Sequence, residues 1–300
     1  MPTLANTLAA TATLSAVSVL ALPMLGLARA NTASQQAIFH ARLVARGIEW
    51  HATDTGHYAP AFRTNPDGTI THHSAMLLAG GYVASEADFT SPLAPGGGAP
   101  SAGSHAMQAR RLAFTVNGAI MPPEPLQYSG TDRHYRPVAH RGTAPQSAHR
   151  LMHQGEPMAP ASTLLVTEWL VTEWLATDGY AALRQGERIL SHRPIVPFLG
   201  ESAGRSPERE AVAGASATPF RYPAAGDIFP DNAPFAEALT SHGPTEINAM
   251  GRSHAGHRAA MVMLDGSARL ATPRQSVEQR LWGRAFHSIT GGRGVGGVGG

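Results

Sequence analysis

The sequence predicts an α+β fold in which a long N-terminal helix, with a membrane half and an amphipathic half, packs on an antiparallel β-sheet with long loop insertions. Three observations predict it. No charged side chain lies between Thr3 and Ala28, the stretch after it has a helical apolar period, and the remainder alternates short apolar runs with proline- and glycine-rich segments. With 300 residues, 43% of them hydrophobic, the chain can form one domain with its own core.

We divide the chain into four parts. These are an anchor helix at residues 1–30, its amphipathic continuation at 31–57, a β-rich globular domain at 58–290, and a disordered glycine-rich tail at 291–300.

The anchor is predicted from length and composition. As a helix, residues 7–28 would span about 33 Å at ~1.5 Å per residue, close to the ~30 Å hydrocarbon core of a bilayer. Pro23 would kink this helix near its end. The alternative is a secretory signal peptide, because Ala28-Arg29-Ala30 is a small-x-small cleavage site and the mature chain would then begin at Asn31.

The amphipathic continuation is predicted from spacing. Apolar residues recur three and four positions apart, and charged residues lie elsewhere on the helix, which indicates one apolar stripe packed against a folded body. The stripe consists of Ala33, Ala37, Ala41, Val44 and Ile48, and Gly56 is expected to end the helix.

The body is expected to be mainly strands and loops. Four apolar runs bounded by turn residues predict strands at Ser74–Leu78, Leu112–Val116, Thr163–Val166 and Ala259–Leu264. The last run should form a hairpin with Ala268–Leu270 through a primed turn at Asp265-Gly266. Long irregular insertions are expected at residues 120–162 and 201–226.

One pentapeptide is repeated in tandem, as Leu165–Trp169 and again as Leu170–Trp174. A shift of five residues reverses the two faces of a strand, so both copies cannot bury the same side chains in one element. We expect one copy in the sheet and the other displaced from it. Trp169, Trp174 and Trp282 are expected to pack in the core or near the membrane.

Composition excludes several classes of function. The chain has no cysteine, so disulfides, thiolate metal sites and thiol nucleophiles are excluded. All 23 basic residues are arginines, which excludes Schiff-base chemistry and a phosphate-loop lysine. The formal charge is only +2 and Arg110-Arg111 is the one adjacent basic pair, so we predict no nucleic-acid binding.

One motif suggests an enzyme. Gly200-Glu201-Ser202-Ala203-Gly204 matches G-x-S-x-G, and Asp231 and then His242, His254 or His257 follow in the chain order of α/β hydrolases. An exported serine hydrolase using Ser202, Asp231 and His254 is therefore the alternative function. Against it, Pro194 and Pro197 interrupt the strand that must precede the serine, so we expect a solvated loop.

The fifteen histidines suggest metal binding, with His72-His73, His254, His257 and Asp265 as the best candidates. None has the i, i+4 spacing with a glutamate that a helical zinc site needs. We therefore predict no metal and no cofactor, and expect His254 and His257 to bond to loop backbone near the hairpin.

Both ends of the chain resemble one family. At the N-terminus Thr3 and Leu4 fit a prepilin-type start, Asn6 stands where that family has a glutamate, and Pro23 lies near the end of the apolar span. At the other end, His254 to Leu270 resembles the prepilin-associated domain named for a histidine, nine residues and Asp-Gly. Here Asp265-Gly266 follows His254 after ten residues, and Trp282-Gly283-Arg284 also fits. The chain thus resembles the bacterial pseudopilin-like proteins.

The resemblance implies a non-catalytic structural component of a type II secretion or type IV pilus-like system, or a membrane-anchored surface protein derived from one. Its partners would be sister pseudopilin-like subunits, the inner-membrane secretion apparatus and membrane lipid. The chain would cross the inner membrane once and place its globular domain in the periplasm or at the cell surface. Asn6 and Met1 replace the family's glutamate and cleavage-site glycine, so processing and filament packing would differ from the family's usual pattern.

Overall fold

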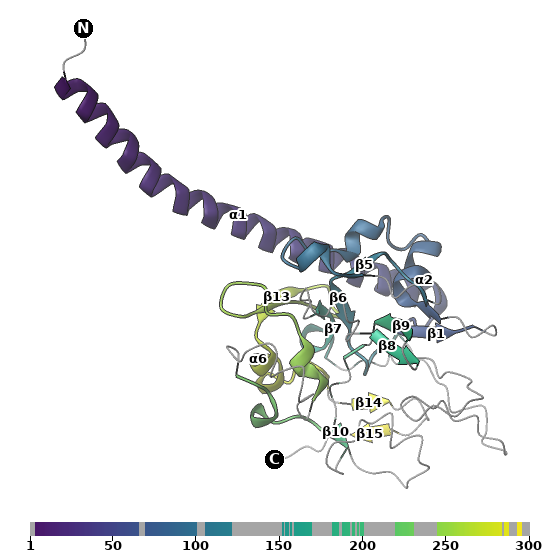
Figure 1. Cartoon of the computed structure of the whole chain (residues 1–300). Helices are drawn as coiled ribbons and strands as arrows, with labels where there is room; N and C mark the ends of the chain where they lie inside the picture. Colours follow the sequence, from purple (N-terminus) through teal and green to yellow (C-terminus); the bar gives the residue numbers. More distant parts are fainter. Residues whose placement is uncertain are drawn as a thin grey trace, which may run out of the picture.

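The computed structural model describes residues 4–65, 70–100, 106–121, 152, 154–155, 157, 159–169, 182–185, 188–192, 194–195, 197, 199–200, 220–230, 245–283, 285–287 and 293–295, and within residues 4–25 it describes only the backbone. These residues form a long helix and several sheets, most of them antiparallel, so the predicted α+β class is confirmed (Figure 1).

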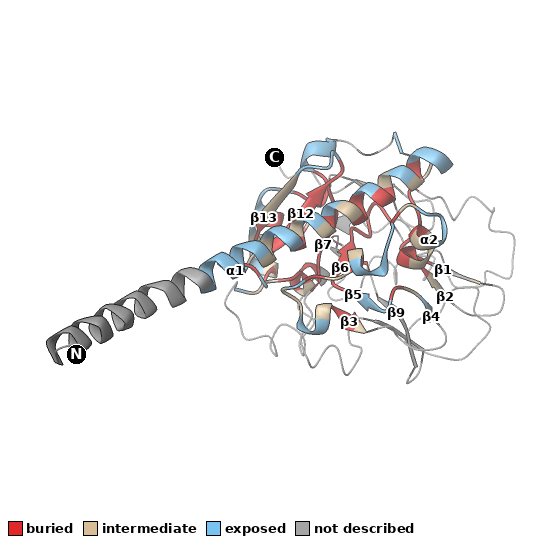
Figure 2. Cartoon of the chain, turned by 90° about the horizontal axis from the view of Figure 1, so that it is seen from above, coloured by how far each residue is buried: buried red, intermediate tan, exposed pale blue. Residues whose placement is uncertain are grey.

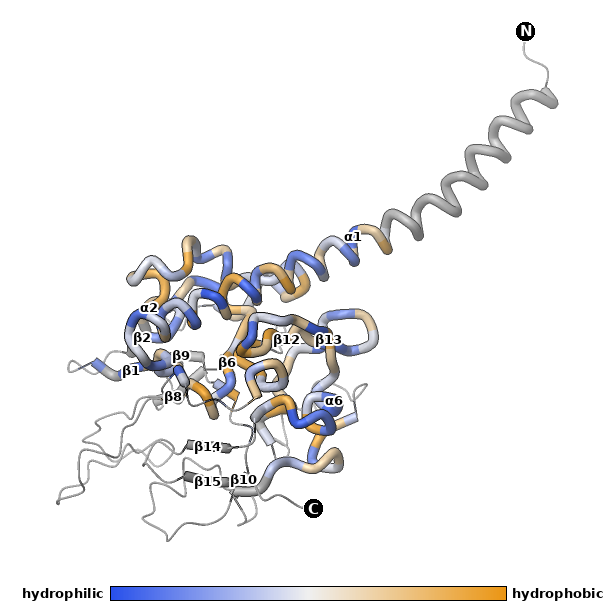
Figure 3. The backbone as a smooth tube through the Cα atoms, turned by 180° about the vertical axis from the view of Figure 1, so that it is seen from behind, coloured by the Kyte–Doolittle hydropathy of each residue, from blue (hydrophilic) through white to orange (hydrophobic). Residues whose placement is uncertain are grey.

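Helix α1 (Leu4–Thr55) has 52 residues, and its C-terminal half crosses over the central sheet (Figure 2). Ala37, Ala41, Val44 and Ile48 are completely buried, as the apolar stripe predicts, and Figure 3 shows hydrophobic and hydrophilic residues alternating along this half of the helix. Residues 26–32 are exposed and extend beyond the body.

Gly56 ends α1 as predicted. Its φ of 80° is left-handed, and its N–H donates to the Ala52 carbonyl at 2.8 Å. A second glycine, Gly47, lets the helix lie close to its neighbour, because a Cβ there would be 2.5 Å from Val83 Cγ2 and 2.9 Å from the Tyr82 carbonyl oxygen. Contacts this short explain why the helix carries no side chain at that position.

The central sheet has the strand order β13-β12-β7-β6 and is antiparallel throughout. Its strands are β6 (Phe114–Val116), β7 (Leu164–Glu168), β12 (Ala259–Met263) and β13 (Ala268–Ala271). Three of the predicted strand segments therefore pair with one another, although they are far apart in the sequence. The first copy of the tandem repeat begins within β7, and the second lies outside the described residues.

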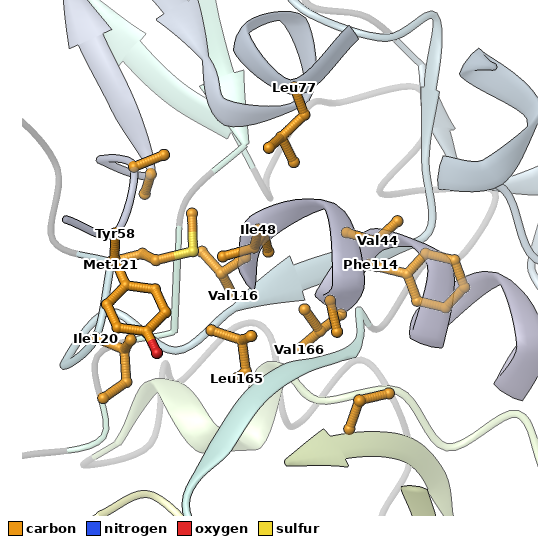
Figure 4. Close-up of a cluster of buried hydrophobic side chains, with 14 of the residues drawn as sticks. Val44, Ile48, Tyr58, Leu77, Phe114, Val116, Ile120, Met121, Leu165 and Val166 are labelled. Carbon is orange, nitrogen blue, oxygen red and sulfur yellow. The ribbon is translucent and has the colours of Figure 1, made fainter. Parts of the chain in front are cut away.

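The sheet is buried on both faces. Val166 and Val262 face α1, in the core that Figure 4 shows around Val44 and Ile48. Met261 and Met263 face the opposite way, into a second core with Trp282. Because successive side chains of a strand point to opposite faces, the residues of β12 alternate between these two cores.

Smaller elements surround this sheet. The short strands are β1 (Phe62–Thr64), β2 (Ile70–His72), β3 (Ala99–Pro100), β4 (Ala106–Met107), β5 (Arg111–Leu112), β8 (Ala182–Gln185), β9 (Arg188–His192), β10 (Leu199–Gly200), β11 (Phe220–Arg221), β14 (Ala285–His287) and β15 (Arg293–Val295). They pair antiparallel, except that β2 and β4 are parallel. The short helices are α2 (His73–Ala79), α6 (Pro273–Glu278) and 3-10 turns that include η1 (Glu86–Phe89), η4 (Pro160–Ser162), η5 (Ala225–Asp227) and η6 (Glu246–Ala249).

The prediction of a strand at Ser74–Leu78 is wrong, because this run lies in helix α2. A short apolar run fits the period of a helix as well as that of a strand, and here a cap at the N-terminus favours the helix. His72 Nδ1 accepts a hydrogen bond from the Ser74 N–H at 3.2 Å. The helix buries Ser74 and Leu77 and stops at Gly80.

One further expectation is corrected. The β12–β13 hairpin forms as predicted, but its turn is not primed, because only Gly266, at φ 79°, has a positive φ and Asp265 does not. Bonds from Gly266 N to Met263 O and from Met263 N to Ser267 O instead close a three-residue loop. Within the tail expected to be disordered, Arg293–Val295 pairs with β14.

Replacing Ile48 with alanine should lower the free energy of unfolding by about 2–5 kcal/mol, because its fully buried side chain would leave a cavity between α1 and the sheet. Chemical denaturation followed by the fluorescence of buried Trp169 and Trp282 measures this. Phe39→Ala, on the same helix but 58% exposed, is the control and should change stability by less than about 0.5 kcal/mol.

The His73→Gln variant should reduce the dependence of stability on pH. Burial lowers the pKa of His73 from 6.5 to about 4, so between these values only the unfolded chain binds the proton. Stability from neutral His73 is complete above pH 6.5 and falls as the pH drops toward 4, by up to about 1.4 kcal/mol per pH unit. The measurement is denaturant unfolding across this range, and an unchanged slope in His73→Gln would contradict the assignment.

Candidate functional site

A polar cluster lies under α1, where the helix meets the sheet. Three elements contribute to it: Ser34 comes from α1, Glu168 is the last residue of β7, and His254 lies in the segment before β12. His254 Nδ1 is 2.6 Å from Ser34 Oγ, and His254 Nε2 is 2.8 Å from Glu168 Oε2. The side chains of His254 and Glu168 are 0% and 3% exposed, so this is a buried contact between ionisable groups.

Glu168 has further partners that stabilise its buried carboxylate. Oε2 accepts the Ala260 N–H at 2.8 Å, and Oε1 accepts the Ser91 hydroxyl at 3.2 Å. Gly251 packs directly over the side chain, since a Cβ there would lie 2.7 Å from Glu168 Cβ. Buried carboxylates need several such donors, because desolvation of the charge is costly.

The two contacts of His254 differ in geometry. The distance from Nε2 to Glu168 is short, but the N–H direction does not meet the angle of a hydrogen bond, so the two side chains are in close contact without a hydrogen bond between them. With a proton on Nε2, Nδ1 is free to accept from the Ser34 hydroxyl. His254 therefore connects the helix to the end of β7, and its ring does not contact loop backbone as the sequence analysis expected.

The prepilin-associated motif residues lie at separate places around this hairpin. Asp265 is exposed in the turn, where Oδ1 accepts from the N–H of Ser267 at 2.9 Å and from its hydroxyl at 2.6 Å, and these bonds lower the pKa of Asp265. Trp282 is fully buried, and its Nε1 donates to Ser276 Oγ at 2.9 Å. Thr3 lies outside the described residues, and Leu4, Asn6 and Pro23 belong to the part of α1 described by its backbone alone.

The residues of the hydrolase alternative are only partly described. Ser202 and Asp231 lie outside the described residues, as does His242. His254 is described, and both of its ring nitrogens face oxygens of the buried cluster. It could act as a general base for Ser202 only if the cluster under α1 opened.

The candidate metal ligands are not assembled. The rings of His72 and His73 lie with their centroids 3.9 Å apart at an interplanar angle of 42°, and His73 Nδ1 is 3.1 Å from the Ala61 carbonyl. His257 is exposed, with a φ of 55°. Across the described parts of the chain, no group of three or more His, Asp or Glu side chains is placed to hold a metal ion.

The sequence analysis missed Ser34, Glu168 and Ser91 as members of one cluster. One signal was available: Glu168 is the only ionisable residue in an otherwise apolar and threonine-containing strand. Its partners come from positions 77 or more residues away, and nothing local in the sequence indicates that they meet.

Comparison with known proteins gives no further assignment, since no family model, no curated protein and no solved structure matches the chain. Within the described residues, none of the helices is both long enough and apolar enough to cross a membrane.

His254→Ala should lower the free energy of unfolding by about 3–5 kcal/mol, because it removes the buried ring that lies 2.8 Å from the buried Glu168 carboxylate. Adding Glu168→Gln to this variant should recover part of the loss, since a neutral amide is cheaper to bury. Denaturant unfolding of the two single variants and the double variant measures the coupling. His257→Asn is the control, because His257 is exposed and asparagine tolerates its positive φ.

Proposed function

We propose that the chain is a non-catalytic structural subunit built on the pseudopilin plan, held in the inner membrane by its N-terminal helix. It serves in a type II secretion or type IV pilus-like apparatus, or as a surface protein derived from one. Its globular domain lies in the periplasm or at the cell surface, and its partners are sister subunits and the inner-membrane apparatus.

The observation that carries this proposal is the division of α1. The helix has 52 residues, and its buried stripe begins only at Ala37. The preceding residues therefore account for roughly 50 Å of helix at ~1.5 Å per residue, and Leu27, at 66% exposed, has no cover from the body. A lone helix is marginal in water, so this part needs another environment, such as lipid or a neighbouring helix.

The sequence supports lipid as that environment, because no charged residue lies between Thr3 and Ala28. The polar cluster fits the same proposal, because it holds the helix in place on the globular domain. It joins Ser34, close to the point where α1 leaves the body, to buried Glu168 and His254. A subunit that transmits force or position from a membrane to a globular domain needs its helix fixed to that domain.

The mature N-terminus tests this proposal directly. We expect mass spectrometry of membrane and soluble fractions from the native host to find the chain in the membrane, starting within its first few residues. A soluble chain starting at Asn31 would instead identify a cleaved signal peptide and would overturn the proposal of a membrane anchor.

A substitution gives a second readout of the same proposal. Leu20→Arg should move the protein from the membrane to the soluble fraction, because an arginine at the centre of a membrane helix costs about 2.5–3.5 kcal/mol. Gln35→Arg, on the exposed surface of the same helix beyond the anchor, should not change the distribution.

A further inference from the structure

We propose that a cleft beside the C-terminal end of α1 binds an organic cation, an alkylammonium or alkylguanidinium group, through the carboxylate of Glu49. The cleft has a volume of about 340 Å³, within the range of small-molecule sites. Its lining includes Glu49, Tyr58, Gln154, Pro157, Pro160 and Leu264. None of these residues belongs to the polar cluster, so this site is independent of the proposed structural function.

The end of α1 creates the cleft. Glu49 follows buried Ile48 and lies at the edge of the apolar stripe, where it is half-buried. Gly56 then turns the chain back, and Tyr58 is held under the helix by a bond from its N–H to the Met152 carbonyl at 2.9 Å. From there the Tyr58 hydroxyl donates to Glu49 Oε1 at 3.0 Å.

The carboxylate is oriented, and among the residues that the structure describes it has no positively charged partner. Burial raises the pKa of Glu49, and the hydrogen bond from Tyr58 partly opposes this shift. Burial and the neighbouring carboxylate raise the pKa of Tyr58, so its hydroxyl keeps its proton and remains a donor. Among the described residues, no arginine or histidine forms an ion pair with Glu49. A bound cation would therefore relieve the cost of burying this charge.

The walls select an organic cation. Pro157, Pro160 and Leu264 offer apolar surface next to Glu49, the one carboxylate among the described lining residues, and this suits a methylene chain that ends in N–H donors. A bare metal ion requires more oxygen ligands than one carboxylate supplies. Gln154 Nε2 donates to Thr53 Oγ1 at 2.8 Å, so only its amide oxygen could accept from a bound cation.

Calorimetric titration of the full chain tests the proposal with three probes of similar shape: butylguanidinium, butylammonium and neutral butylurea. Both cations should bind, and butylurea should bind at least about tenfold more weakly, as expected for a lost charge-assisted hydrogen bond. Glu49→Gln should reduce cation binding by a similar factor. Glu86→Gln, which removes a carboxylate paired with Arg110 at 3.5 Å on the surface, should leave it unchanged.

A Gly-Arg-Gly peptide with blocked termini distinguishes the possible sources of the cation, when its affinity is compared with that of butylguanidinium. Tighter binding than butylguanidinium would identify a basic side chain of a protein partner, and equal or weaker binding a free amine or guanidine. The proposal would be overturned if neither cation bound saturably, if butylurea bound as well as the cations, or if a folded Glu49→Gln variant bound them with unchanged affinity. The comparison of charged and neutral probes on the unmodified chain holds even if that variant fails to fold.

Discussion

Helix α1 packs on the central sheet through an apolar stripe of small and branched side chains. Ala41, Val44, Ala45 and Ile48 are buried in the core that joins helix and sheet, and Gly47 allows the chain at Tyr82 and Val83 to approach from the side. Both sites described above follow from this contact. The same helical register that buries the alanines places Ser34 over His254 and Glu49 next to Tyr58.

The polar cluster has a different physical role from the apolar contact. Burying the Glu168 carboxylate costs free energy that its partners only partly return, so the cluster is not a simple source of stability. What it provides is position, because Glu168 meets its donors, Ser91 and Ala260, and the ring of His254 only when distant segments of the chain lie in one arrangement. Apolar packing tolerates small shifts of a helix along a sheet, and a hydrogen-bonded cluster tolerates fewer.

Sequence reasoning succeeded where the period of the pattern is long or the turn chemistry is strong. The stripe from Ala37 to Ile48 and the β12–β13 hairpin are of this kind. It failed at Ser74–Leu78, because a run with only four apolar residues fits a strand or a helix and the cap at His72 was not recognised. The Glu168–His254 contact joins residues 86 positions apart, and no local pattern encodes such a meeting. The cleft at Glu49 likewise depends on where the chain returns after Gly56.

The tandem repeat gives the central strand a competitor within its own chain. Strand β7 is Leu-Leu-Val-Thr-Glu at residues 164–168, and residues 169–173 read Trp-Leu-Val-Thr-Glu. A chain threaded five residues late would present four identical side chains to β6 and β12, and would differ only by a tryptophan in the fully buried place of Leu164. Within the strand, the volume of one side chain therefore separates the native threading from its near-copy, and just before it a glutamate would take the buried place of Thr163. The start of β7 is thus where this protein distinguishes a correctly folded molecule from a slipped one.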